Sequence, residues 1–273
     1  MLRRWCTLLV TTALVAGTWL AAGSAAAAPA AQRAAGHPAG FSPGGLMTKP
    51  VTAQQPGAAP GVFNATVQST NWSGYAATGA TGAFTSVSAS WTVPAATCPS
   101  AAAQFSSFWA GLDGFNSASV EQTGTDSDCD GTTPNYYGWY EMFPAAPVIF
   151  ANPVQPGDQI SASVTFSGTE TYTLVLSDST QGWTQTITQN QPGLDRSSAE
   201  VISEAPSSSA TGGVLPLADF GTVNYAASQA NGTSLASQNP TEILMVDASG
   251  TAEDSTSAIA SNGAFSNTWL GSS

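Results

Sequence analysis

Apolar and polar residues alternate with a period of two along much of this chain. The clearest run holds Val87, Ala89, Trp91 and Val93, with serine or threonine at the positions between them. Successive side chains of a strand point to opposite faces, so this pattern predicts a strand with one buried face and one solvated face. Similar runs occur at residues 160–166, 172–176, 243–246 and 265–269.

No segment of the sequence shows convincing helical periodicity, and Gly, Ser, Asn and Pro separate the strand-like runs. Frequent short strands with such turns are typical of two packed antiparallel sheets. Ser and Thr, more than Lys and Glu, occupy the outward positions. We therefore expect an all-β fold, an antiparallel sandwich of the concanavalin or jelly-roll kind.

The first 28 residues have the pattern of a signal peptide. Two arginines, Arg3 and Arg4, precede an apolar run from Leu8 to Leu20, and small alanines follow at residues 25–28. The apolar run is too short for a membrane span. The pattern predicts a secreted, extracellular protein.

Residues 29–64 are rich in Ala, Gly and Pro and show no periodicity. Such a composition is typical of disorder, so this segment is expected to be a leader or propeptide. It carries Arg33, Lys49 and His37 and no acidic residue, which predicts electrostatic attraction to an acidic domain and inhibition of the precursor. Residues 65–273 have the length of one β-sandwich domain.

The expected domain is strongly acidic. All seventeen acidic residues lie at or after Asp113, whereas Arg196 is the only basic residue beyond position 64, which gives a formal charge of −16. Nucleic acid and anionic membranes require clustered Lys and Arg, so we expect neither as a partner after signal removal. Carboxylate protonation at acid pH relieves the self-repulsion, although simple solubility explains the charge equally well.

Histidine and cysteine usage limits the chemistry further. The single histidine, His37, lies in the leader, so the domain can build no Ser-His-Asp triad, Cys-His dyad or His-ligated metal site. Carboxylate chemistry remains, and we expect no metal and no cofactor. Cys98 and Cys129 are the two cysteines left in an exported chain, and we expect a disulfide worth about 3 kcal/mol by the chain-entropy estimate.

The run DSDCDG begins like a calcium-binding loop. Asp126, Asp128 and Asp130 have the spacing of its first ligands, but Tyr137 stands where the loop needs a glutamate. The sequence therefore favours a surface turn with solvated aspartates.

An aromatic segment at residues 136–143 places a carboxyl group among rings. Tyr137, Trp139, Glu141 and Phe143 fall on one face of a strand. Spacing alone favours core packing over a groove for a peptide or a sugar. In the core, Glu141 would need a hydrogen bond or a raised pKa.

The run SSAEVISEAP places two glutamates on one face of another strand. Glu200, Ile202 and Glu204 share that face. Two such carboxyl groups can form a catalytic pair, but spacing alone favours an exposed face.

Six sequence blocks, in the same order, resemble the glutamic peptidases, also called eqolisins. These blocks are NWSGY (71–75), SASWTVP (88–94), FWAGLDG (108–114), EQTGT (121–125), WYEMFP (139–144) and AEVISEAP (199–206). The chain is similar to a bacterial-type member of that family. The resemblance implies a β-sandwich endopeptidase that works at acid pH without a metal.

The resemblance also implies roles for individual residues. Gln122 corresponds to the oxyanion-stabilising glutamine, and Glu204 corresponds to the glutamate that activates water, whereas Glu200 is a neighbour. The residues that correspond to the family's substrate groove are Trp72, Trp109, Asp113 and Glu141. Glu121 replaces an apolar residue of fungal members, and Val201 and Ser203 replace bulkier residues, which affects substrate preference.

Two other functions fit the residues without the resemblance. A secreted carbohydrate-binding module would share the sandwich and the aromatic residues. A glycosidase would use paired carboxyl groups such as Glu141 and Glu204. A dependence on Gln122 distinguishes the peptidase, for which we expect polypeptide substrates and a monomer.

Overall fold

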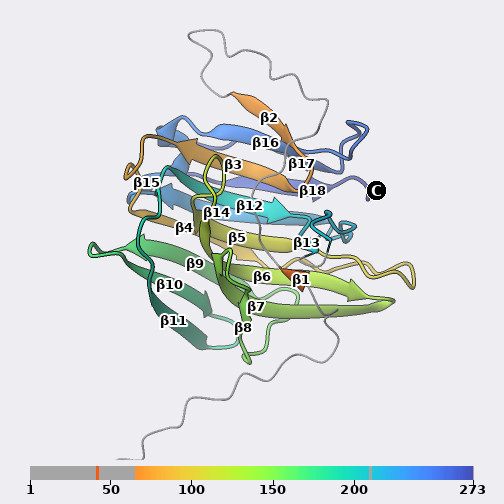
Figure 1. Ribbon diagram of the computed structural model, residues 1–273. Coiled ribbons are helices and arrows are strands. Elements are labelled where there is room, and N and C mark those ends of the chain that lie inside the picture. The colour runs from red at the N-terminus through yellow and green to blue at the C-terminus, as the bar shows by residue number, and fades with distance from the viewer. Residues whose placement is uncertain (1–40, 43–64, 209–210, 273) are drawn as a thin grey trace, which may run out of the picture. The chain divides into compact units, whose positions relative to one another are not determined.

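The computed structural model describes residues 41–42, 65–208 and 211–272, the first pair by its backbone alone. The expected signal peptide and most of the expected leader lie outside the described residues. Apart from a short 3₁₀-helix, η1 (Leu235–Gln238), the regular elements are β-strands. They form two large sheets that pack as a sandwich, which confirms the expected fold class (Figure 1).

Sheet 1 has eight strands and carries the candidate site. All neighbours are antiparallel except β2 and β16, which run parallel. In spatial order its strands are β2 (Thr66–Ser69), β16 (Thr241–Met245), β3 (Trp72–Thr78), β12 (Ser198–Glu204), β5 (Ser107–Leu112), β6 (Val120–Asp130), β7 (Thr133–Phe143) and β8 (Val148–Ile149).

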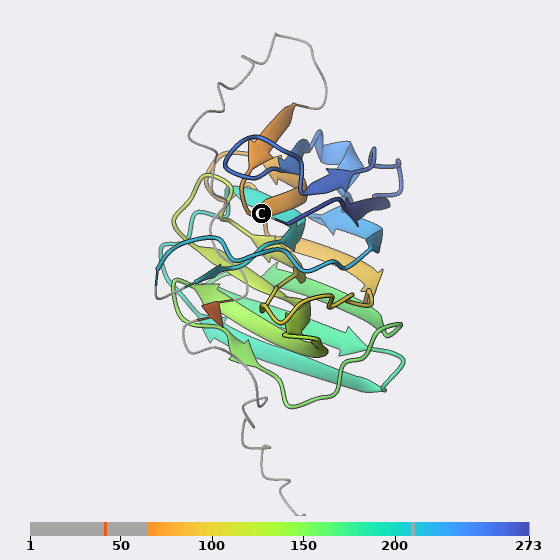
Figure 2. The same ribbon diagram turned by 90° about the vertical axis from the view of Figure 1, so that its right-hand side faces the viewer.

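Sheet 2 lies behind sheet 1 in the view of Figure 1. Figure 2 shows both layers from the side. A short strand, β15 (Thr233–Ser234), pairs with β14 beside the main path. In spatial order the other strands are β11 (Trp183–Asn190), β10 (Thr171–Asp178), β9 (Gln159–Phe166), β4 (Ser86–Thr92), β14 (Thr222–Ala230), β18 (Phe265–Trp269) and β17 (Asp254–Thr256).

The main core fills the space between the sheets. Phe108 and Leu112 of sheet 1 meet Trp91, Leu174 and Tyr225 of sheet 2, and all five side chains are buried. The alternation at residues 87–93 therefore predicted β4 and its buried face correctly. Burial of such large apolar side chains supplies most of the folding free energy, roughly 1.5–3 kcal/mol for each side chain.

A second apolar cluster lies on the outer face of sheet 1. It includes Trp72, Trp109, Trp139 and Ile202, each 0% exposed. A sheet face that points away from the sandwich core is normally solvated in an antiparallel sheet. Four large buried side chains there mark this face as a place where polar groups are held among rings.

A third, two-stranded sheet joins distant parts of the chain. In it β1 (Phe41–Ser42) pairs antiparallel with β13 (Ser207–Ser208), which begins three residues after Glu204. A short piece of the expected leader thus pairs beside the end of β12.

Candidate active site

Gln122 and Glu204 lie on the same outer face of sheet 1, on β6 and β12, with β5 between them. The register places Gln122 opposite Gly111 and Glu204 opposite Ser107, so they are two strands and four positions apart. Both side chains are 0% exposed. The exposed face that spacing alone favoured for Glu200 and Glu204 is therefore wrong, because both glutamates are fully buried. Between the described side chains of Gln122 and Glu204 no hydrogen bond forms, and other residues must connect them.

Trp109 of β5 connects them. Its indole Nε1 donates to Glu204 Oε2 at 2.8 Å, and Asn71 Nδ2 donates to Glu204 Oε1 at 3.3 Å. The six-membered ring lies over Gly111, because a Cβ added there would stand 2.8 Å from Trp109 Cζ3 and 3.1 Å from Gln122 Cβ. The missing side chain of Gly111 leaves room for this indole between Glu204, which it contacts, and the position opposite Gln122.

Trp72 supports this indole from β3. Its ring meets Trp109 edge-on, with centroids 4.9 Å apart and an interplanar angle of 76°, a favourable arrangement of aromatic rings. The indole N–H of Trp72 also faces Glu204, although it forms no hydrogen bond with the carboxyl group. Both tryptophans implied by the resemblance therefore lie at Glu204.

Glu141 holds the amide of Gln122. Gln122 Nε2 donates to Glu141 Oε2 at 2.7 Å, and the two residues are directly opposite in the β6–β7 pair. A primary amide has two N–H donors, so the second one is left to contact another group. The carboxyl group of Glu141 also faces Glu204 closely enough to affect its ionisation. Spacing alone favoured core packing for this face, and Tyr137 and Trp139 do pack in a buried apolar cluster. That cluster lies on the outer face of sheet 1, where Glu141 is buried and hydrogen-bonded.

The pKa of Glu204 is raised well above its ordinary value. Burial is the largest cause, and the nearby carboxyl groups of Glu141 and Asp126 add to it, whereas the hydrogen bond from Trp109 opposes it. Removal of a carboxylate from water disfavours its charged form. In this enclosed state Glu204 therefore holds a proton at acid pH.

The carboxyl groups of Asp126 and Asp128 both lie within hydrogen-bond distance of one hydroxyl group, that of Tyr137. Tyr137 Oη lies 2.7 Å from Asp126 Oδ2 and 2.8 Å from Asp128 Oδ2, and Trp139 Nε1 donates to Asp126 Oδ1 at 2.6 Å. One hydroxyl donates one proton, so at least one of the two carboxyl groups must carry its own. Burial raises the pKa of Asp126 to about 7 and that of Asp128 well above its ordinary value.

The surface-turn interpretation of DSDCDG is thus wrong for its first two aspartates. Asp126 and Asp128 are 0% and 4% exposed and belong to β6, and only Asp130 lies at the exposed turn. The cause is the β6–β7 register, which places Tyr137 opposite Asp126 and supplies donors to both carboxyl groups.

Asp113 lies just after β5, away from the Gln122 amide. Its carboxylate accepts hydrogen bonds from the backbone N–H groups of Arg196 and Ser197, at 2.6 and 2.8 Å, and from the Ser197 hydroxyl at 3.2 Å. Asp113 therefore binds the segment just before β12. Its contact with substrate remains a prediction from the resemblance.

Two further buried glutamates flank the site without joining it. Glu200 lies in the same row as Gln122, across Gly111. Burial, Asp113 and Glu121 raise its pKa well above the ordinary value, as burial does for Glu204. Glu121 points to the opposite face, into the core near Tyr172. Burial and the charge of Asp113 raise the pKa of Glu121 to about 9.

The expected disulfide is confirmed. Cys98 and Cys129 are bonded, with their Cα atoms 5.5 Å apart. Cys129 also exchanges backbone hydrogen bonds with Gln104, just before β5. The bond therefore ties the segment before β5 to the end of β6, the two strands that carry Trp109 and Gln122.

Sequence reasoning missed four residues of the site: Asn71, Gly111, Asp126 and Asp128. Asn71 and Gly111 lie inside sequence blocks that carry the resemblance to the family, but the sequence alone indicated no function for either residue. Among the described residues, no group of three or more His, Cys, Asp or Glu side chains is arranged to hold a metal ion.

Solved structures of glutamic peptidases share the fold of this chain. Scytalido-glutamic peptidase, solved with a transition-state analogue inhibitor, aligns with a TM-score of 0.64 at 25% identity, over 74% of this chain and 98% of that one. SCP-B, an eqolisin solved with the tripeptide Ala-Ile-His, shares the fold with a TM-score of 0.59 at 24% identity, over 74% and 98%. Aspergilloglutamic peptidase from Aspergillus niger shares it with a TM-score of 0.53 at 23% identity, over 61% and 99%.

The sequence itself gives the family. No curated protein matches the chain. The model of the Peptidase A4 family, however, matches residues 70–269, which include every strand of both large sheets from β3 onward. The chain belongs to the Peptidase A4 family and is a glutamic endopeptidase.

Proposed function

We propose that this chain hydrolyses peptide bonds at acid pH through Gln122 and Glu204. The observation that carries the proposal is Trp109, whose indole donates to Glu204 while its six-membered ring lies over Gly111, the residue directly opposite Gln122. Glu141 completes the set, because it holds one N–H of the Gln122 amide. The four side chains form a single constellation with an amide donor at one end and a carboxyl group at the other.

Glu204 acts first as a base and then as an acid. It takes a proton from a water molecule as the water oxygen attacks the peptide carbonyl carbon. The protonated carboxyl group then gives this proton to the departing amine as the C–N bond of the tetrahedral intermediate breaks. No bond forms between substrate and protein in this sequence.

Gln122 stabilises the oxyanion that develops on the carbonyl oxygen. The amide cannot ionise, so the N–H that Glu141 leaves available can donate at any pH. A single side-chain amide donor of this kind contributes about 3–4 kcal/mol to stabilisation of the transition state.

The base needs water in the site. Burial is the largest cause of the raised pKa of Glu204, and the side chain is 0% exposed in the full chain. Entry of substrate and water removes part of this cause and lowers the pKa of Glu204 toward acid pH. The enclosed arrangement is therefore the resting state, with Glu204 protonated.

Substitutions of the two residues test the proposal. Glu204→Gln should abolish digestion of denatured casein at about pH 4, and Gln122→Ala should lower kcat by about 10²–10³-fold. Wild-type activity should fall as Glu204 protonates, and Gln122→Ala should leave that acid limb in place. Pepstatin should have little effect, because it mimics the intermediate of an aspartic pair.

Glu200→Gln is the matched control. Glu200 lies on the same strand face as Glu204 and is nearer to Gln122 in the register, which makes it the rival base. It should retain substantial activity. Loss of activity equal to that of Glu204→Gln, or casein digestion by Glu204→Gln, would show that the assignment is wrong.

The proposed activity belongs to a secreted protein whose leader inhibits it. A disulfide is typical of an oxidising compartment, and β1 of the leader pairs beside the end of β12. Removal of residues 1–64 should therefore raise the specific activity near pH 4. Equal specific activity of the full and trimmed chains would show that the leader is a passive linker.

A further inference from the structure

The four edges of the two large sheets differ in how they meet solvent. Three are short: β2 has four residues, β17 has three and β8 has two. The fourth, β11, has eight residues with no charge and no proline. Natural proteins protect sheet edges with short strands, charges or proline, because a long free edge pairs readily with another strand. Only β11 lacks all three protections among these edges.

The backbone of β11 offers free groups at alternate residues. Gln191, which continues the β10–β11 register, donates its N–H to Glu170 O at 2.9 Å. Antiparallel pairs alternate, so the odd-numbered residues of β11 bond to β10 and the even-numbered ones direct their N–H and C=O groups outward. In the described part of the chain no backbone partner meets Thr184, Thr186, Thr188 or Asn190 from that side.

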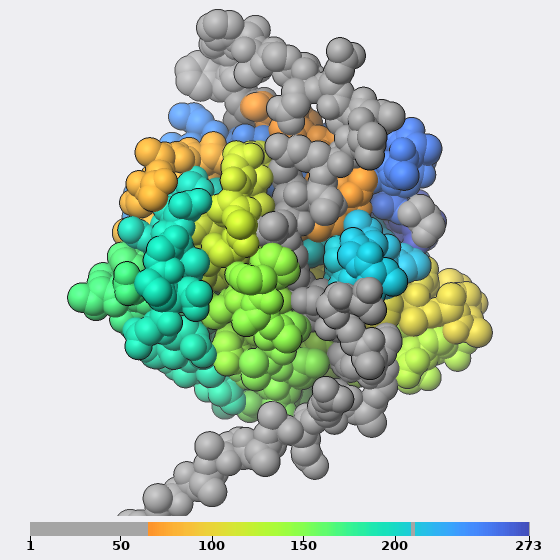
Figure 3. Space-filling view, viewed as in Figure 1, coloured from red at the N-terminus to blue at the C-terminus, as the bar shows by residue number. Residues whose placement is uncertain are grey.

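The strand is also held in place before any partner arrives. Two of its inward side chains bond to the chain after β8: Trp183 Nε1 donates to Pro153 O at 2.8 Å, and Gln185 Nε2 donates to Asn152 Oδ1 at 2.6 Å. A third bonds to β7, because Gln189 Nε2 donates to Tyr140 Oη at 3.4 Å. Figure 3 shows the teal atoms of this part of the chain directly beside green atoms of the β7–β8 region. An edge that is already fixed loses little entropy when it pairs.

The sequence of β11 is symmetric about its centre. In WTQTITQN, Ile187 is flanked by Thr186 and Thr188, then by Gln185 and Gln189. An antiparallel pairing of two copies about Ile187 therefore places Thr opposite Thr and Gln opposite Gln. The outward-facing even residues also oppose one another, so Thr186 of one copy exchanges both backbone hydrogen bonds with Thr188 of the other.

We propose that β11 is a self-pairing edge, through which two copies of this chain associate about a two-fold axis at Ile187. The match between free backbone groups and mirrored side chains fits a second copy better than an unrelated strand. The strand carries no charge in a domain of formal charge −16, so its pairing brings no like charges directly opposite each other. Sequence alone suggested a monomer, because symmetry in one strand has no consequence until that strand is known to be an edge.

Charge exchange at the exposed positions tests the pairing. In the double variant Thr186→Lys with Thr188→Lys, each lysine of one copy lies opposite a lysine of the other copy, and the two repel. The double substitution of the same residues to Glu has the same effect. Thr186 and Thr188 are exposed, so folding is preserved. In equilibrium sedimentation of the full chain, the wild type should show twice the mass of one chain, and each variant alone should show the mass of one chain.

A mixture of the two double variants should again show the paired mass, because Lys then meets Glu at both positions. Thr186→Val with Thr188→Val, which keeps the backbone and adds no charge, is the control and should pair like the wild type. A wild type with the mass of one chain at all concentrations would overturn the proposal. Paired mass in either charged variant alone would also overturn it, because association would then use another surface.

Discussion

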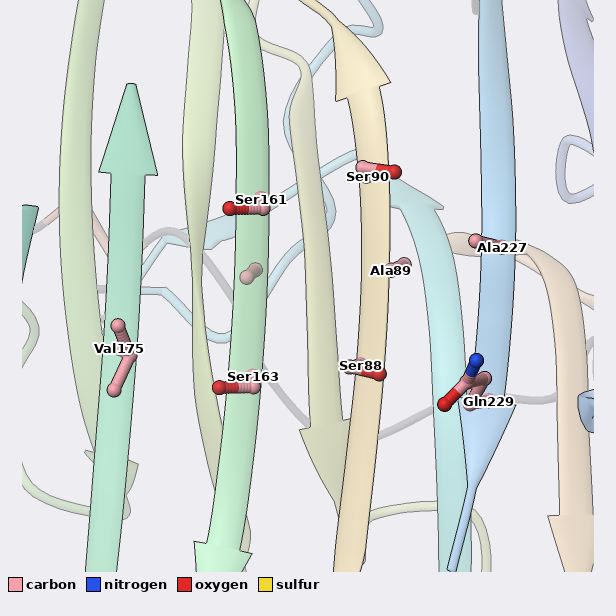
Figure 4. A pocket seen from close by; sticks show the side chains of 9 residues that line it. Ser88, Ala89, Ser90, Ser161, Ser163, Val175, Ala227 and Gln229 are labelled. Carbon is pink, nitrogen blue, oxygen red and sulfur yellow. The ribbon is translucent and has the colours of Figure 1, made fainter. Parts of the chain in front are cut away.

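The two sheets share one alternating pattern but use their polar residues in opposite ways. Eleven of the seventeen acidic side chains are buried, and six of these lie in β6, β7 and β12 of sheet 1. The outer face of sheet 2 instead presents serine and threonine to solvent, as the trough lined by Ser88, Ser90, Ser161 and Ser163 shows (Figure 4). Sheet 1 therefore holds most of the strand carboxyl groups whose protonation depends on burial. Sheet 2 has two, Asp178 and Asp254, and its outer face is lined by hydroxyl groups that do not titrate.

This difference explains how an acidic domain can favour acid conditions. Buried carboxyl groups with raised pKa values bind protons more tightly in the folded than in the unfolded state. Their contribution is favourable below the unfolded pKa and declines as the pH rises toward the folded pKa. The chain should therefore be most stable at acid pH, where the hydroxyl surface of sheet 2 still keeps it hydrated.

Glu121→Gln should have the largest effect on this balance. The pKa of Glu121 is raised from its ordinary value of 4.5 to about 9, so the wild type loses stability as the pH rises through that interval. At pH 7 the folded chain still holds this proton, whereas the unfolded chain has lost it, which lowers the free energy of unfolding by about 3 kcal/mol relative to acid pH. The variant should gain about that free energy of unfolding at pH 7 and little at pH 4, as urea denaturation at both values would measure.

Asp130→Asn is the control for Glu121→Gln, because Asp130 belongs to the same strand but is exposed. It should change stability little at either pH. An equal gain at both pH values in Glu121→Gln would contradict the linkage, since a shape effect does not depend on protonation.

Gly111→Ala should have the next largest effect, on catalysis. The new Cβ would stand 2.8 Å from Trp109 Cζ3, closer than such atoms approach, so the indole must shift. Trp109 holds Glu204, and a displacement of about 1 Å in a catalytic group costs on the order of 10²-fold in rate. Steady-state kinetics should show a lower kcat with a similar Tm.

Gly271→Ala is the matched control, because an added Cβ there has no heavy atom within 4 Å. Its kcat should equal that of the wild type. Wild-type kcat in Gly111→Ala would mean that the position of Trp109 over Gly111 does not determine the geometry of Glu204.

The sequence predicted the parts of this fold that depend on local patterns. Alternation at residues 87–93 identified β4, and the spacing of Glu200, Ile202 and Glu204 placed them correctly on one face of β12. Those inferences need only the strand period of two.

What failed depended on register between strands. Asp126 and Asp128 read as a solvated turn because their donors, Tyr137 and Trp139, belong to the next strand. The register also brings Gly111 opposite Gln122, and nothing local distinguishes that glycine from a turn residue. Pairing register is a tertiary property, so a single sequence specifies it only weakly.

The smallest effect is expected on the outer face of sheet 2, and it would complete the comparison. Ser161 lies on β9 and is exposed (Figure 4), so an acid there should remain solvated. Ser161→Asp should change the free energy of unfolding by no more than about 0.5 kcal/mol at pH 4 and pH 7 alike. Ser161→Asn, which has the same shape without the charge, is the control. The contrary outcome is a loss of stability that grows as the pH rises in Ser161→Asp and is absent in Ser161→Asn. That result would show that this face is shielded from water, as the outer face of sheet 1 is.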